Sequence, residues 1–139
     1  MEKEKSICFS LKRVNHIVER GIHTSLAAAG FDEITNMHGW ILGFLYHAQR
    51  PVYQKDIESN FGIARSTVTN ILQLMEKKGI IRRESVPNDA RLKSLVPTPR
   101  AVKLNAEVSV GLEEMERRLT KGLSSGQVQL FREIAAQML

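Results

Sequence analysis

The sequence predicts a mainly α-helical fold with a small β-wing, arranged as a winged helix-turn-helix with a long helix at each end. Three observations predict this fold. Residues 54–61 and 65–78 are two short amphipathic segments, and a three-residue turn that begins at Gly62 separates them, as in a helix-turn-helix. Two runs with β-strand character and a turn between them follow within residues 80–96. Long segments with helical apolar periodicity flank this stretch on both sides.

The second helix of the pair, residues 65–78, has one apolar face and one polar face. Its apolar residues recur at i, i+3, i+4 and i+7, and they are Val68, Ile71, Leu72 and Met75. Gly79 follows, at the position where a helix C-cap favours a positive φ. The polar face carries hydroxyl, amide and cationic side chains, and its first acid is Glu76. Such a face suits the major groove of DNA, which admits one helix and offers base edges to Ser, Thr, Asn and Gln.

A β-hairpin is predicted after this helix, with strands at residues 80–84 and 92–96. Residues 87–89, Pro-Asn-Asp, have the chemistry of a turn. The connection is too long for a two-residue hairpin, so we expect a loop that projects from the module. Its tip would carry Asp89 and Arg91.

Four longer helices are predicted outside the helix-turn-helix, at residues 5–28, 36–48, 99–122 and 125–139. Thr35 and Ser124 are candidate N-caps, and Ser124 with Gln127 has the pattern of a capping box. A short strand is expected between the second and third helices of the chain. The first helix carries Phe9 and Ile17 off its main apolar stripe, so we expect a second subunit to bury that face.

The positive charge of the chain is concentrated in the predicted winged helix. The net charge of the 139 residues is +5. Residues 50–103 contain 11 lysines and arginines and 5 acids, so they carry +6, whereas the remainder carries −1. This concentration favours a polyanionic partner, because release of condensed counterions drives binding to nucleic acid. It argues against a winged helix that binds only protein.

The predicted winged-helix stretch resembles the MarR-type (multiple antibiotic resistance regulator) family of winged helix-turn-helix transcriptional regulators. The resemblance is dense from Tyr53 to Ala101, and outside this range only the order of the helices and the total length match. The segments that carry it are residues 57–62, Arg-Ser-Thr-Val-Thr at 65–69, Leu-Met-Glu-Lys-Lys-Gly-Ile-Ile at 74–81 and Asn-Asp-Ala-Arg at 88–91. Its most specific part is the Asp-x-Arg at the wing tip in combination with the preceding Glu-Lys-Lys-Gly.

The resemblance implies a single domain over residues 1–139, with dimerisation helices at about 5–30 and 100–139 and a winged-helix DNA-binding region at about 35–99. It implies a regulator, most often a repressor, that binds double-stranded DNA as a homodimer on an inverted repeat and uses no cofactor. It also implies a small aromatic effector bound where the two parts meet. We expect His38, Trp40 and Phe44 to line that pocket.

The DNA contacts are expected from the second helix of the pair and from the wing. Thr67, Thr69 and Asn70 are the first candidates for the major groove. The other predicted contacts are Gln54, Arg65, Ser66, Gln73, Asp89, Arg91 and Lys93. In the family, the wing arginine enters a minor groove and the aspartate orients it, so we expect Asp89 to hold the Arg91 guanidinium through a charge-assisted bond.

A thiol, peroxide or metal sensor with the winged helix as its output is the alternative function. Cys8 lies in Ile-Cys-Phe-Ser-Leu, which resembles the reactive-cysteine segment of the family's hydroperoxide sensors, but residues 5–28 lack the tyrosines that accompany it there. The histidines lack the close ligand spacing of zinc sites, so no metal site is expected; they are His16, His23, His38 and His47.

Several other classes of protein are not expected. The chain lacks a Gly-rich phosphate loop and an HExxH motif, so we expect no enzyme. It has no apolar run of 18 residues and no signal-peptide pattern at its N-terminus. A single cysteine fits a reducing compartment, so we expect a cytoplasmic protein.

Overall fold

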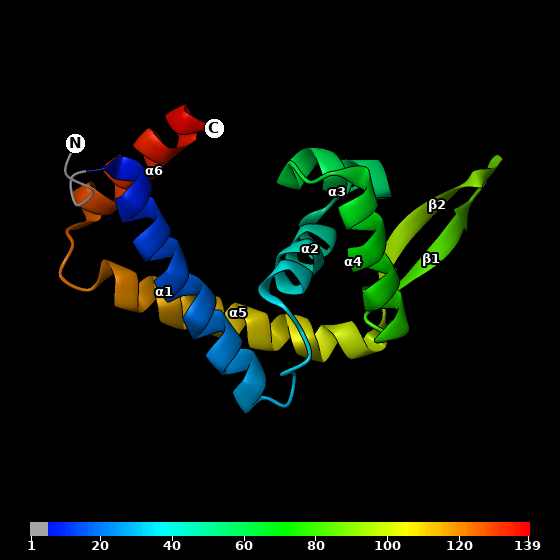
Figure 1. Ribbon diagram of the computed structural model, residues 1–139, viewed down its shortest axis with the longest axis horizontal. Helices are drawn as coiled ribbons and strands as arrows, with labels where there is room; N and C mark the ends of the chain where they lie inside the picture. Colours follow the sequence, from blue (N-terminus) through cyan, green and yellow to red (C-terminus); the bar gives the residue numbers. More distant parts are fainter. Residues whose placement is uncertain (1–5) are drawn as a thin grey trace.

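The computed structural model describes residues 6–139, and within them it confirms a mainly helical fold with a small two-stranded wing (Figure 1). The elements in order are α1 (Ile7–Ala28), α2 (Asn36–His47), α3 (Gln54–Phe61), α4 (Arg65–Lys77), β1 (Ile81–Val86), β2 (Asp89–Pro97), α5 (Pro99–Thr120) and α6 (Ser125–Met138). α1 crosses one half of α5, α2 packs on the other half, and the wing projects away from the termini (Figure 1). The predicted start of the first helix at Lys5 lies outside the described residues.

Reciprocal caps hold the starts of α2 and α6, and they confirm Thr35 as an N-cap and Ser124 with Gln127 as a capping box. Thr35 Oγ1 accepts the N–H of His38 at 3.3 Å, and His38 Nδ1 accepts the N–H of Thr35 at 3.2 Å. Ser124 Oγ and Gln127 Oε1 form the equivalent pair, at 3.2 and 2.9 Å. Each pair satisfies N–H groups that a helix leaves without an intrahelical partner.

The start of α3 is held by a carboxylate instead of a hydroxyl cap. Asp56 accepts the backbone N–H of Tyr53 at 2.8 Å, and its two oxygens accept from the Arg50 guanidinium at 2.9 and 3.2 Å. The hydrogen bonds from Arg50 lower the pKa of Asp56, so its charge is kept at the helix N-terminus, where it is favourable. A tyrosine can therefore precede α3 without loss of its cap.

The helix-turn-helix packs its apolar residues into the hydrophobic core that it shares with the helices on either side. Ile57 of α3 and Val68, Leu72 and Met75 of α4 are completely buried. Burial of side chains of this size contributes about 1.5–3 kcal/mol each. Gly62 makes the turn with φ +63, a conformation that costs little without a Cβ. The apolar side of α4 is thus buried in the core, so its polar face points outward.

The wing closes through a two-residue turn, so the prediction of a longer loop was wrong. β1 and β2 pair antiparallel, and Val86 at the end of β1 pairs with Asp89. Only Pro87 and Asn88 connect them, with Asn88 at φ +72, which asparagine tolerates better than most residues. Residues 90–92 are accommodated as a bulge in β2. The extra residues lengthen one strand and leave the turn short.

The short strand predicted between α2 and α3 is reduced to one hydrogen bond. The carbonyl of Val52 accepts the N–H of Leu95 in β2 at 2.8 Å, but the sheet formed by the described residues has two strands. Pro51 has no N–H to give to a ladder, so the pairing cannot extend toward α2.

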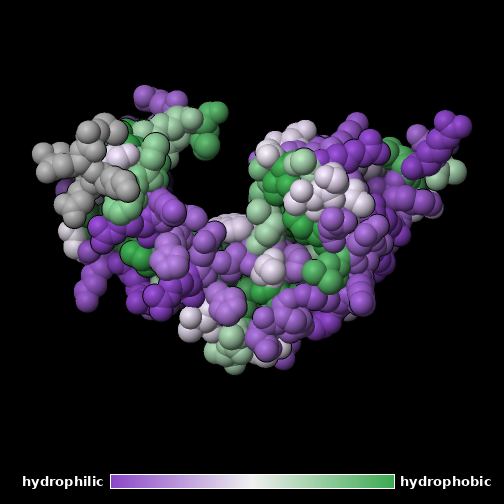
Figure 2. All heavy atoms as spheres, in the orientation of Figure 1, coloured by the Kyte–Doolittle hydropathy of each residue, from purple (hydrophilic) through white to green (hydrophobic). Residues whose placement is uncertain are grey.

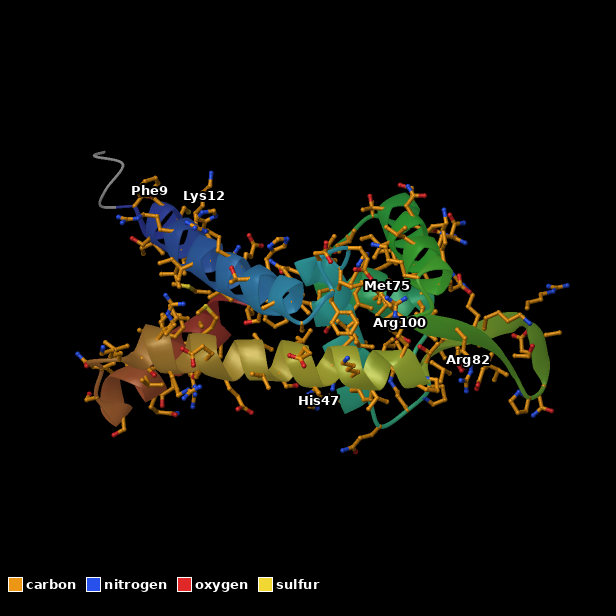
Figure 3. All side chains as sticks on the ribbon, turned by 90° about the horizontal axis from the view of Figure 1, so that it is seen from below. Phe9, Lys12, His47, Met75, Arg82 and Arg100 are labelled. Atoms are coloured by element: carbon orange, nitrogen blue, oxygen red, sulfur yellow. The ribbon has the colours of Figure 1, made fainter. Side chains whose placement is uncertain are left out.

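The terminal helices approach closely at one point and leave apolar side chains exposed elsewhere. A Cβ at Gly21 of α1 would lie 2.1 Å from Sδ of Met115 in α5, so a larger residue at 21 would require the flexible Met115 side chain to move. Ile7, Phe9 and Ile17 of α1 are exposed, and Figure 3 shows Phe9 on the side of α1 that faces away from α5. α6 buries none of its residues. Within residues 6–139, every helix is too short or too polar to cross a membrane.

Candidate nucleic-acid interface

The outer face of α4 presents most of the predicted contact residues to solvent. The exposed ones on this helix are Arg65, Ser66, Thr67, Asn70 and Gln73. They form one continuous polar surface because the buried stripe occupies the opposite side of the helix. α4 lies at the surface of the molecule, beside the wing (Figure 1). Thr69 is the exception, since it is only half exposed.

Gln54 and Thr69 are hydrogen-bonded to each other, which changes what each can do. Gln54 Nε2 donates to Thr69 Oγ1 at 2.8 Å and to Glu58 Oε1 at 3.2 Å. The Thr69 hydroxyl donates in turn to the backbone carbonyl of Arg65 at 2.9 Å. Its proton and one acceptor position are therefore occupied, and it is less available to a base edge than the exposed amide of Asn70.

A cleft of about 390 Å³ lies between the starts of α3 and α4 and the wing. Its lining consists of Tyr53, Gln54, Lys55, Glu58, Arg65, Arg83, Arg91, Leu92 and Lys93. Five of these nine residues are cations and one is a carboxylate. A cleft lined mainly by one sign of charge focuses the field on its mouth, and here the field attracts anions.

The cations of the cleft differ in whether the protein already uses them. Arg83 Nε donates to Glu76 at 3.0 Å, and Lys93 Nζ donates to Ser85 Oγ at 2.6 Å. The cleft cations whose side chains form no hydrogen bond within residues 6–139 are Lys55, Arg65 and Arg91. These three keep all of their donors for an external anion such as a phosphate diester.

Sequence reasoning did not single out Lys55 and Arg83 for this interface. Both belong to the positive surplus of residues 50–103, which is the only signal the sequence offers for them. Their place in the cleft depends on how the wing folds back beside the start of α3, and no local pattern specifies that arrangement.

Asp89 holds the backbone of the wing tip and not the guanidinium of Arg91, so that prediction was wrong. Asp89 Oδ1 accepts the backbone N–H of Arg91 at 3.0 Å. This is the bond of an aspartate to the chain two residues on, which is common in turns. It fixes the path of the backbone at the tip and leaves the Arg91 side chain free to turn toward a partner.

The three residues predicted to line an effector pocket lie in three different environments. His38 is 2% exposed and caps α2 through Nδ1. Burial and then the charge of Lys78 lower the pKa of His38 to about 4. Trp40 is exposed, whereas the ring of Phe44 packs edge-on against Phe61 with centroids 6.0 Å apart. The three side chains therefore have different surroundings, and the effector pocket stays a prediction.

The alternative chemistries find little support in the described residues. Cys8 is exposed near the start of α1, and His16 and His23 are exposed on the same helix. Among residues 6–139, no group of three or more His, Cys, Asp or Glu side chains could hold a metal.

Residues 122–126 read Gly-x-Ser-x-Gly, a pattern of serine hydrolases. Here Ser124 caps α6 between two helices, whereas a nucleophile elbow follows a strand.

A family model settles the type of this module. Residues 33–92 match the model described as the MarR family. The matched range contains α2, the helix-turn-helix and most of the wing. This module is therefore of the MarR type.

Solved structures of MarR-type proteins resemble the chain over nearly all of its length. It is 26% identical to MepR of S. aureus in a complex with DNA, over 96% of both chains, with a TM-score of 0.83. It is 27% identical to the same protein in a DNA-binding conformation, again over 96% of both chains, with a TM-score of 0.81. CouR of Rhodococcus jostii RHA1, bound to p-coumaroyl-CoA, shares the fold at 19% identity, over 99% of this chain and 94% of that one, with a TM-score of 0.83. The terminal helices thus belong to the same fold as the MarR-type module.

Proposed function

We propose that this MarR-type chain is a sequence-specific, DNA-binding transcriptional regulator that acts in the cytoplasm as a repressor. The observation that carries the proposal is the exposed polar face of α4 beside a cleft with three uncommitted cations, Lys55, Arg65 and Arg91. An α-helix with such a face fits the major groove, and the cations reach the phosphates on either side. The similarity to MepR, whose structure was solved in a complex with DNA, supports the same use of this face.

In this proposal the residues divide their tasks by position. Thr67, Asn70 and Gln73 on the exposed face of α4 contact base edges, whereas Lys55 and Arg65 contact the phosphate backbone. Arg91 at the wing tip enters the neighbouring minor groove, whose negative potential is strongest where the groove is narrow.

We further propose that two copies bind one inverted repeat through their terminal helices. The support is the apolar surface of these helices, since Phe131 of α6 is 59% exposed and Ile7 of α1 is 62% exposed. An isolated chain gains nothing from exposing such side chains, and a contiguous apolar surface of this kind usually marks an interface. Two copies related by a two-fold axis would place their α4 helices on half-sites about 34–36 Å apart.

Selection of a duplex from random sequence by the pure protein tests the function. We expect one enriched sequence with two-fold symmetry, and tighter binding to it than to a scrambled duplex of equal length. We expect the logarithm of the affinity to fall linearly with the logarithm of the salt concentration, because each phosphate contact releases counterions. Enrichment of no sequence, together with equal affinity for the scrambled duplex, would contradict the proposal.

A small aromatic effector stays a prediction. His38 is buried, Trp40 is exposed and Phe44 packs on Phe61, so these contacts add no support to the prediction. Titration of the selected duplex complex with salicylate as a probe, followed by fluorescence anisotropy, would test whether an aromatic acid releases the protein.

A further inference from the structure

Three residues from distant parts of the sequence form a closed ring of hydrogen bonds where α4 ends. Arg100, at the start of α5, donates to the backbone carbonyl of Lys78 and, at 2.8 Å, to Oε1 of Glu33 in the α1–α2 loop. Lys78, which follows α4, donates through Nζ to the backbone carbonyl of Glu33. Each member of this ring therefore bonds to both of the others. We call Glu33, Lys78 and Arg100 the junction ring.

The junction ring and Thr98 bind the backbone carbonyls that directly follow α4. In the last turn of α4, the carbonyls of Leu74, Met75 and Glu76 accept the backbone N–H groups of Lys78, Ile80 and Gly79. The start of α5 provides partners for three successive carbonyls, because Arg100 binds that of Lys78, the Thr98 hydroxyl binds that of Gly79 and the Thr98 N–H binds that of Ile80 at 2.9 Å. The charges of Lys78 and Arg100 are also favourable at the negative end of the α4 dipole. The end of α4 is thus attached directly to the start of α5.

This attachment matters because α4 and α5 otherwise pack on different neighbours. α4 packs mainly on α3 and β1, whereas α5 packs on α1, α2 and β2. α5 continues from this junction to the exposed apolar surface of the terminal helices. A change in the angle between α4 and α5 would therefore move the helix proposed to bind DNA relative to the helix that leads to the proposed dimer interface.

We propose that the junction ring fixes the angle of α4 relative to α5, with Arg100 as its positioning residue, and thereby sets the distance between the two α4 helices of a dimer. The statement on distance rests on the proposed function, whereas the statement on the angle does not. Arg100 suits this task because a planar guanidinium can hold two acceptors at a fixed angle, which a lysine ammonium cannot. The side chains of Arg100 and Glu33 are about half exposed, so the ring adds little to stability and its effect lies in geometry.

Spin labels within one chain test the angle without DNA and without reference to dimerisation. Labels are attached to cysteines at Gln73 in α4 and Ser109 in α5, in a chain with Cys8→Ser, and the labelled protein is diluted with unlabelled protein. Pulsed dipolar spectroscopy then gives the distribution of distances between the two labels. We expect Arg100→Lys and Arg100→Met to broaden or shift this distribution, and Lys103→Met, which removes a cation one turn along α5, to leave it unchanged. Distributions of equal centre and width in all four proteins would overturn the proposal.

Duplexes whose half-sites are moved apart in steps of one base pair test the consequence for DNA. We expect the wild type to prefer one spacing and Arg100→Lys to lose several-fold in this preference, with an unchanged dependence of the affinity on salt. If Arg100 instead contacts a phosphate, Arg100→Lys would keep the spacing preference and Arg100→Met would lower the salt slope by about one unit, which contradicts the proposal. If the wild type prefers no sequence, the proposed function fails, and the distances between labels still decide on the junction ring.

Discussion

The winged-helix module buries most of its large apolar residues, whereas parts of the terminal helices leave theirs exposed. Within the module, from α2 to β2, the large apolar residues left exposed are Trp40, Tyr46 and Leu74, and its core is closed. The terminal helices instead expose large apolar residues along the first half of α1, from Ile7 to Ile17, and along α6, from Leu130 to Met138. Figure 2 shows hydrophobic residues on the arm that carries α6.

This contrast indicates which surface is complete in a single chain. The module has no need of a partner to bury its core, so its polar face remains free for DNA. α6 has a full capping box and buries none of its residues, so its helix is well specified while its apolar face is not yet used. The core of the winged-helix module is therefore complete in one chain, whereas the terminal helices keep an apolar surface that fits the proposed dimer interface.

Substitution of Phe131 by lysine should have the largest effect, which is separation of the dimer into monomers. A charge in the exposed apolar face of α6 would have to be desolvated in the dimer, so we expect monomers in sedimentation velocity. Loss of the second half-site contact should lower the affinity for the selected duplex by about 10²–10⁴-fold. Gln129→Lys, on the opposite side of α6, is the control and should remain dimeric. Dimers of Phe131→Lys with wild-type affinity would place the interface elsewhere.

Substitution of His38 by asparagine should remove an acid sensitivity that belongs to the module alone. The pKa of His38 is about 4 in the folded chain and 6.5 in the unfolded one, so between these values the unfolded chain binds the extra proton. The stability associated with neutral His38 is complete above pH 6.5 and is lost as the pH falls toward 4, in total about 3 kcal/mol. Asparagine can keep the Nδ1-like acceptor for Thr35 but does not titrate.

Urea unfolding at several pH values measures this effect. We expect the stability of wild type to fall between pH 6.5 and pH 4 by about 3 kcal/mol more than that of His38→Asn. His47→Asn, at an exposed histidine of the same helix, should follow the wild type. Parallel curves for wild type and His38→Asn would show that His38 is not the group responsible.

Substitutions on the outer face of α4 should separate readers of DNA from residues that position them. Asn70→Ala should lose about 1–3 kcal/mol of discrimination at one base pair. Thr69→Val and Gln54→Ala each break the same hydrogen bond, so their combination should cost no more than either alone. Competition among single-base variants of the selected duplex measures these losses. Additive effects of Thr69→Val and Gln54→Ala would mean that each contacts DNA independently.

Substitutions at the wing tip should give the smallest effects. Arg91→Ala should leave the fold unchanged and lower the salt slope by about one unit. Asparagine at 89 keeps the acceptor for the Arg91 N–H and removes a negative charge, so Asp89→Asn should bind DNA at least as tightly as wild type. Asp89→Ala should bind more weakly because the tip loses its bond. Weaker binding of Asp89→Asn than of wild type, measured by anisotropy, would return Asp89 to a role in orienting the guanidinium.

The elements that periodicity and end signals specify could be predicted from the sequence. The range of α3, the caps at Thr35 and Ser124 and the buried stripe of α4 all agree with the structure, because each depends on neighbours within one turn. The wing was misjudged because its bulge is defined by pairing across strands and not along one of them.

The candidate site was predicted only in part for the same reason. The exposed residues of α4 follow from its periodicity, so they could be identified. The bond between Gln54 and Thr69, the cleft at Lys55 and the junction ring each join segments that are far apart in the sequence. The sequence showed that residues 50–103 carry surplus positive charge, but it did not show how these side chains are arranged. Their arrangement decides which side chains remain free for DNA.

The central claim is that two chains pair through their terminal helices and bind one duplex through their winged-helix modules. The number of chains bound to one selected duplex tests this claim most directly. Sedimentation of the complex should give the mass of the duplex plus twice the chain mass of 15.7 kDa, with no complex of duplex and single chain at any protein concentration. A duplex with one half-site scrambled should bind the same two chains far more weakly. Stable binding of one chain, with equal affinity for the intact and half-scrambled duplexes, would contradict the account.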